Sequence, residues 1–192
     1  MGGTLAYPPE ELIGRNQRVA VLCFATDQSP ADGYTVGPLA QDEAICYRSS
    51  LSCSLHTHYY PWSPRAALYT QDIICIRSSM STGHRLLVPE TPPSQLPVVS
   101  VTSLAAIDRP NLETNRLGDT VFKNSSDYSL TKDKMRLALR IAAKKEHELL
   151  VLGALGCGGR RNAPNEMARC WISVLDEPEF RGGWWREIVS WV

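Results

Sequence analysis

The sequence has no excess of charge of either sign, because 20 Lys and Arg residues balance 20 Asp and Glu residues. A neutral chain creates no overall field that would draw it to nucleic acid or to an acidic membrane surface. Any anion must therefore be held by a local site. We expect neither direct DNA binding nor membrane binding.

Long apolar runs are also lacking, and no stretch is long enough to cross a membrane. The first residues do not show the basic segment and apolar stretch of a secretion signal. The six cysteines mostly lie inside apolar segments, where they are typical of small buried side chains rather than of a disulfide framework. We therefore expect a reducing compartment, the cytoplasm or the nucleus.

A metal-ligand pattern is lacking as well. Cys46, Cys53, His56 and His58 are close in sequence, but their spacing matches no familiar zinc motif. We expect no metal site and no cofactor.

The length of 192 residues suits one domain, with residues 1–17 as a short arm. Apolar runs of strand length occur at residues 18–26, 68–76, 96–103, 149–153 and 186–191. Helices are expected at 39–50, from a cap at Thr131 to about Glu146, and from Pro164 onward. Residues 111–128 show no period and predict a surface loop. Strands that alternate with helices indicate an α/β fold with a mixed, largely parallel sheet.

A glycine-rich loop follows the strand expected at residues 149–153 and leads into the helix at Pro164. Glycines let backbone N–H groups approach a ligand closely, and a helix N-terminus favours negative charge. A phosphate or diphosphate fits such a loop. A tight turn that packs the helix on the strand would also select glycine.

Two carboxylates, Asp42 and Glu43, open the helix that follows the strand at residues 18–26. If that strand lies beside the strand at 149–153, the loops after them face each other, and Glu43 can act on a bound sugar phosphate. Alternatively, both are acidic residues of the kind favoured near a positive helix end.

The two loops together resemble those of the microbial-type poly(ADP-ribose) glycohydrolases. That family has a strand, a Pro-Gly-Gly-Gly loop, seven residues and then Gln-Glu-Glu. Here Pro30-Ala31-Asp32-Gly33 takes the place of the first motif, and Gln41-Asp42-Glu43 takes the place of the second. The stretch LLVLGALGCGGRRNAPNEMAR is similar to the family's phosphate-binding loop.

This resemblance implies a macrodomain-like α/β/α sandwich that binds ADP-ribose or poly(ADP-ribose), free or on modified proteins, as a monomer. It implies that Glu43 is the acid/base that cleaves the ribose–ribose bond and that Asp42 positions the ribose. The ligand-binding residues that it implies are Cys23, Thr26, Ala31, Asp32, Gly33, Gln41, Gly153, Leu155, Gly156, Cys157, Gly158, Gly159, Arg160 and Asn162.

Several positions depart from the family pattern. Ala31 and Asp32 replace loop glycines, and a carboxylate about 4 Å from a phosphate charge costs about 4 kcal/mol at an effective dielectric near 20. Arg160 can pair with Asp32 or contact a phosphate. Cys23 replaces an asparagine, and Asp42 is shorter than the family's glutamate. Two alternatives therefore stay open: a non-catalytic reader of ADP-ribose and a hydrolase of another ADP-ribose linkage.

Two further features have alternative interpretations. Cys157 is either a reactive thiol at a helix N-terminus or a small residue in a tight turn. The aromatic cluster of Tyr59, Tyr60 and Trp62 either stacks on a nucleotide base or packs its loop against the hydrophobic core.

Overall fold

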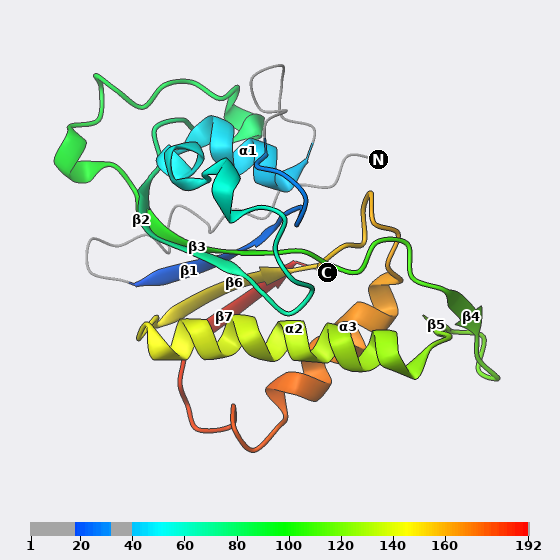
Figure 1. The fold of residues 1–192 in the computed structure, drawn as a ribbon. Coiled ribbons are helices and arrows are strands. Elements are labelled where there is room, and N and C mark those ends of the chain that lie inside the picture. Colours follow the sequence, from blue (N-terminus) through cyan, green and yellow to red (C-terminus); the bar gives the residue numbers. More distant parts are fainter. Residues whose placement is uncertain (1–17, 32–39, 192) are drawn as a thin grey trace.

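A five-stranded sheet forms the centre of the computed structural model, which describes residues 18–31 and 40–191 (Figure 1). Its strands are β1 (Val19–Phe24), β2 (Leu68–Ile74), β3 (Val98–Leu104), β6 (Leu149–Gly153) and β7 (Glu187–Trp191). The strand order is β2-β3-β1-β6-β7, with only β2 antiparallel to its neighbour in this sheet. This confirms the expected mixed, largely parallel sheet, and each strand falls at its predicted position.

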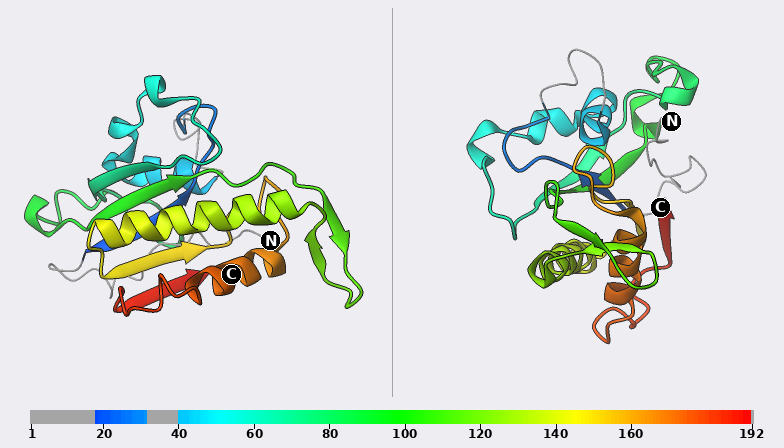
Figure 2. Two further views of the ribbon diagram at one scale, coloured as in Figure 1. Left: turned by 60° about the horizontal axis from the view of Figure 1, so that its bottom comes forward. Right: turned by 90° about the vertical axis from the view of Figure 1, so that its right-hand side faces the viewer.

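Helices cover both faces of this sheet. Helix α1 (Gln41–Arg48) lies on one face, and α2 (Ser125–Lys144) and α3 (Pro164–Leu175) lie on the other (Figures 1 and 2). None of the helices within the described ranges is long and apolar enough to cross a membrane. The layers form the α/β/α sandwich that was expected, although α1 is shorter than the predicted 39–50.

The central strand β1 explains why its sequence is apolar without interruption. Ala20 and Leu22 belong to the apolar cluster shared with α2 and α3, whereas Val21 and Cys23 belong to the cluster on the α1 side. Successive side chains of a strand point to opposite faces, so a strand covered on both faces needs apolar residues at every position.

Helix α2 begins six residues before its predicted cap, so the assignment of Thr131 as N-cap was wrong. Asn124 is the N-cap, and its Nδ2 donates to Asp127 Oδ2 at 3.1 Å. Thr131 lies inside the helix and is buried. The first turn packs little against the core, so it carries no apolar period that would reveal it in the sequence.

The prediction of a surface loop over residues 111–128 was also wrong. These residues contain a hairpin of β4 (Leu112–Thr114) and β5 (Thr120–Phe122) and the first turn of α2. Asn115 Oδ1 closes the turn by accepting from the N–H groups of Leu117 and Asp119, both at 2.9 Å. Strands of three residues are too short to show an alternating pattern.

The parallel strands β1, β3 and β6 end at the same edge of the sheet. Ala20 pairs with both Ser100 and Leu150, which confirms that the strands at 18–26 and 149–153 are neighbours. The segments that follow these three strands therefore gather at one rim, where ligands of open α/β sheets bind.

Candidate active site

A cavity of about 620 Å³ lies at this rim. That volume is within the range usual for small-molecule sites. The described residues that line it are Phe24, Ala25, Thr26, Ala40, Gln41, Asp42, Glu43, Ala106, Gly156, Gly158, Gly159 and Arg160. The cavity thus has carboxylates on one side and a glycine loop with an arginine on the other.

Gln41 fixes the start of α1 to the end of β1. The pairing of β1 with β6 reaches only Val21, and β1 continues beyond it. There Gln41 Oε1 accepts from the N–H of Phe24 at 2.8 Å, and its Nε2 donates to the carbonyl of Leu22 at 3.4 Å. The side chain therefore takes the place of a neighbouring strand, and it positions the two residues that follow.

Asp42 and Glu43 occupy the first turn of α1 and both line the cavity. Glu43 Oε2 accepts from the N–H of Ala40 at 3.2 Å, and Asp42 Oδ1 accepts from the N–H of Glu43 at 3.0 Å. Carboxylates at a helix N-terminus are stabilised by the unpaired N–H groups there. The two groups are therefore held at the cavity wall by the helix start itself.

Burial raises the pKa of the Asp42 carboxyl above its usual value, although the Glu43 N–H and the Arg160 guanidinium counteract this rise. Only 8% of Asp42 is exposed. A raised pKa in the folded state means that folding disfavours the ionised form of Asp42. The resulting loss of stability is complete above the pKa of the folded state and disappears below the pKa of the unfolded state.

We therefore expect Asp42→Asn to unfold at a higher temperature than the wild type at pH 7, because the amide keeps the acceptor for Glu43 without the buried charge. The difference should shrink as the pH falls toward 4. Thermal melts from pH 4 to 8 measure this, with Glu113→Gln on exposed β4 as the control. A lower melting temperature at every pH would contradict the account.

The glycine loop after β6 contributes Gly158 and Gly159 to the cavity wall. Within the described residues, neither Gly158 nor Gly159 donates its N–H to a protein acceptor. Both residues are exposed, and a Cβ added at either would meet nothing within 4 Å. Packing therefore does not require glycine there, and the open space allows a ligand to approach this backbone closely. The N-terminus of α3 follows at Pro164 and adds partial positive charge.

Asn162 and Gly156 hold this loop against the segment after β3. Asn162 is buried, and its Nδ2 donates to the carbonyls of Ile107 at 2.8 Å and of Gly156 at 3.2 Å. Gly156 has φ +74°, and a Cβ there would lie 2.4 Å from Ala106 Cβ. The loop conformation therefore depends on glycine at this position.

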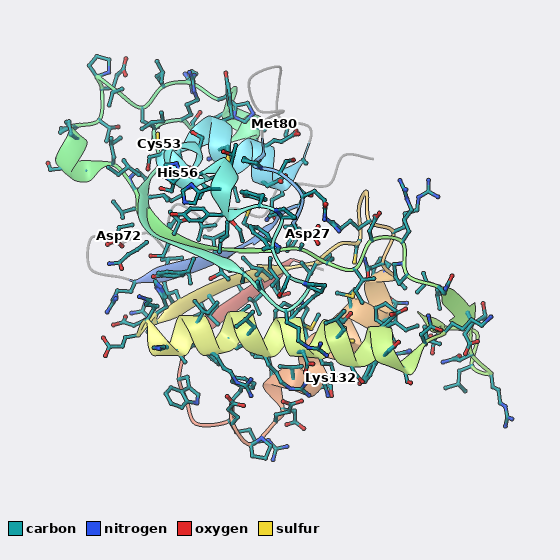
Figure 3. All side chains as sticks on the ribbon, in the orientation of Figure 1. Asp27, Cys53, His56, Asp72, Met80 and Lys132 are labelled. Atoms are coloured by element: carbon teal, nitrogen blue, oxygen red, sulfur yellow. The ribbon has the colours of Figure 1, made fainter. Side chains whose placement is uncertain are left out.

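Arg160 contacts a residue that the sequence did not indicate. Its Nη2 lies 3.4 Å from Asp27 Oδ1, and its Nη1 donates to the carbonyl of Ala106 at 2.9 Å. Asp27, which follows β1, is labelled in Figure 3. The Arg160 guanidinium thus spans from the glycine loop to the ends of β1 and β3. Asp32, which was one of the two alternatives for Arg160 beside a phosphate, lies outside the described residues.

The predicted ligand-binding residues divide into two groups. Thr26, Gln41, Gly156, Gly158, Gly159 and Arg160 line the cavity with Asp42 and Glu43. Cys23, Ala31, Gly153, Leu155, Cys157 and Asn162 are not among the lining residues, and of these Cys23, Ala31 and Leu155 pack in the core. Asp32 and Gly33 lie outside the described residues. For all of these residues, a direct ligand contact stays a prediction.

Cys157 does not have the environment of a reactive thiol. Burial raises its pKa to about 11, and its Sγ lies 3.9 Å from the carbonyl of Leu155. A thiol with such a pKa is almost entirely protonated at neutral pH. The interpretation as a small residue in a turn is the one that the structure favours.

Sequence reasoning missed four residues that line the cavity: Phe24, Ala25, Ala40 and Ala106. Ala106 carried a usable signal, because it follows a predicted strand parallel to β1 and so must reach the same rim. The other three are small or apolar and carry no chemical signature.

Two other features of the sequence were a group of Cys and His residues and a group of aromatic residues. Among the described residues, no group of three or more His, Cys, Asp or Glu side chains could hold a metal ion. Trp62 is buried, stacks on Tyr60 and packs with Ala25 and Ala105. Those two aromatic residues therefore fasten their loop onto the core.

The three-layer order, the mixed sheet and a cavity at the rim between two loops define a macrodomain-like fold. Residues 7–79 match the family described as "Microbial-type PARG, catalytic domain", where PARG is poly(ADP-ribose) glycohydrolase. This segment contains β1, α1 and β2. The resemblance to that family is thereby confirmed, and the matching segment contains the first of the two loops but not the glycine loop after β6.

Solved structures of bacterial poly(ADP-ribose) glycohydrolases have the same fold. The enzyme from Thermomonospora curvata is 24% identical with a TM-score of 0.75, over 92% of this chain and 63% of that one. The enzyme from Deinococcus radiodurans in complex with ADP-ribose is 24% identical with a TM-score of 0.70, over 91% and 68%. This chain thus spans less than two thirds of the Thermomonospora curvata enzyme. No curated protein sequence matches it.

Proposed function

We propose that this protein binds ADP-ribose units at the rim cavity and hydrolyses the ribose–ribose O-glycosidic bonds of poly(ADP-ribose). The observation that carries this proposal is the pairing of Glu43 and Asp42 with the Gly158–Gly159 loop across one cavity of about 620 Å³. The matching family and the solved structures of similar fold, one with ADP-ribose and one with the inhibitor ADP-HPD, support it.

The diphosphate of the substrate is expected to lie against the glycine loop. The N–H groups of Gly158 and Gly159, the N-terminus of α3 and the Arg160 guanidinium all favour an anion there. The ribose attached to this diphosphate then reaches toward α1, where Asp42 can accept a hydrogen bond from a ribose hydroxyl.

Glu43 supplies the acid/base chemistry in this proposal. In its protonated form it donates a proton to the ribosyl oxygen of the leaving unit as the glycosidic C–O bond breaks and the remaining ribose becomes oxocarbenium-like. A water molecule then attacks the ribose carbon and gives a proton to the Glu43 carboxylate, which restores the acid. One water is consumed for each ADP-ribose released.

Product analysis tests the function directly. The protein should release ADP-ribose from purified poly(ADP-ribose), as measured by chromatography, and calorimetry should show that it binds ADP-ribose. Binding without release would identify a reader instead of a hydrolase, which is the alternative that the replaced loop positions Ala31 and Asp32 favour. The absence of both would mean that the chain has the fold without the function.

A further inference from the structure

A second cavity of about 570 Å³ adjoins the first. The two share Thr26, Ala106 and Arg160, so they meet at the ends of β1 and β3. The remaining described residues that line the second cavity are Asp27, Gln28, Pro64, Ile107, Asp108, Leu130 and Lys134. The proposed chemistry uses none of these seven.

Arg160 is the charged residue that lines both cavities. Its guanidinium is held by the carbonyl of Ala106 and by Asp27, at 2.9 Å and 3.4 Å. Both side chains of this ion pair are largely covered, with 22% of Arg160 and 23% of Asp27 exposed. An anion bound in either cavity can therefore be contacted by the same arginine.

Lys134 places a second cation at the wall of the second cavity. Its residue is only 4% exposed, and its Nζ donates to the carbonyl of Pro64. Burial of an ammonium group is costly unless it has polar partners. Burial lowers the pKa of Lys134, and the Asp27 carboxylate counteracts this. The cation is thus kept at a cavity instead of in solvent, where most lysines lie.

The rest of the wall suits a nucleoside. Pro64, Ile107 and Leu130 offer apolar surface for a flat base. Asp27, Asp108 and Gln28 offer oxygen acceptors for an exocyclic amino group or for ribose hydroxyls. A volume of about 570 Å³ is ample for an adenosine.

We propose that the second cavity holds the adenosine phosphate portion of the next unit of the polymer, the one joined to the ribose that lies over Glu43. This inference rests on the proposed function and deepens it, because it assigns a subsite for the leaving unit to described residues outside the first cavity. Lys134 contacts a phosphate of that neighbouring unit, and Arg160 lies between the two units.

Calorimetry with single ADP-ribose and with a two-unit oligomer tests this, using Glu43→Gln protein so that the oligomer is not consumed. Lys134→Met in that background should weaken binding of the two-unit oligomer by about 10-fold or more, because a charge-assisted hydrogen bond is lost. Binding of single ADP-ribose should be unchanged. Leu130→Trp, which fills the same cavity, should have the same selective effect.

Lys132→Met is the matched control. Lys132 lies on the same helix but points to α3, where its Nζ donates to Ser173 Oγ at 2.8 Å (Figure 3). The Lys132→Met substitution changes the net charge by the same amount as Lys134→Met, and it should leave the affinities for ADP-ribose and for the oligomer unaltered.

Equal affinity for the two-unit oligomer in Glu43→Gln protein with and without Lys134→Met would overturn the inference. An equal loss for ADP-ribose and the oligomer would also overturn it, because the cavity would then hold the adenosine of the first unit. If ADP-ribose binds to none of the proteins, the proposed function itself fails.

Discussion

Glu43→Gln is expected to abolish release of ADP-ribose from poly(ADP-ribose) while leaving the affinity for ADP-ribose nearly unchanged. General acid–base catalysis contributes about 100-fold to 10,000-fold to a rate, and a glutamine amide can neither donate the required proton nor accept one from water. The amide oxygen can still accept from the N–H of Ala40, so the start of α1 stays in place. Release of labelled ADP-ribose under single-turnover conditions measures the loss.

Two comparisons make this result specific. Glu113→Gln removes an exposed carboxylate from β4, which does not line the cavity, and should leave the rate unchanged. Calorimetry on Glu43→Gln should give the wild-type affinity for ADP-ribose. A variant that still cleaves within a few-fold of the wild type would remove Glu43 from the mechanism.

Gly156→Ala should have the second large effect, a loss of both ADP-ribose affinity and stability. The residue has φ +74°, and the new Cβ would lie 2.4 Å from Ala106 Cβ and 2.6 Å from Asn162 Nδ2. The glycine loop must then shift away from the segment after β3. Left-handed backbone strain alone costs about 1–3 kcal/mol, and the displaced loop would no longer present its N–H groups to a diphosphate.

Gly158→Ala is the matched control for stability in that experiment. Its φ is not in the left-handed region, and a Cβ there meets nothing within 4 Å. Chemical denaturation should therefore show a clear loss of unfolding free energy for Gly156→Ala and none for Gly158→Ala. Similar losses for both would mean that the loop is not held at the Gly156 contact.

The sequence predicted the central sheet well because buried parallel strands are apolar at every position. The runs at residues 18–26 and 149–153 predicted two buried strands, and the structure places these strands side by side. It did not predict the β4–β5 hairpin, since three-residue strands carry no period and the turn depends on the side chain of Asn115. The start of α2 was missed because its first turn packs little against the core and therefore carries no apolar period.

Part of the candidate site could also be predicted, because glycines and paired carboxylates are chemically distinctive. Thr26, Gln41, Asp42, Glu43 and Arg160 do line one cavity. The partner of Arg160 could not be predicted, since 133 positions separate it from Asp27. Contacts over such separations depend on how the loops cross the ends of the strands, which no local pattern records.

Gln41 has a consequence for how this protein can change over evolution. Because its side chain is bonded to the backbone of β1, the two acidic residues after it are positioned by the central strand of the sheet. Substitutions elsewhere in the cavity wall can accumulate without displacing the carboxylates. Ligand preference and the placement of the reactive group can therefore diverge independently.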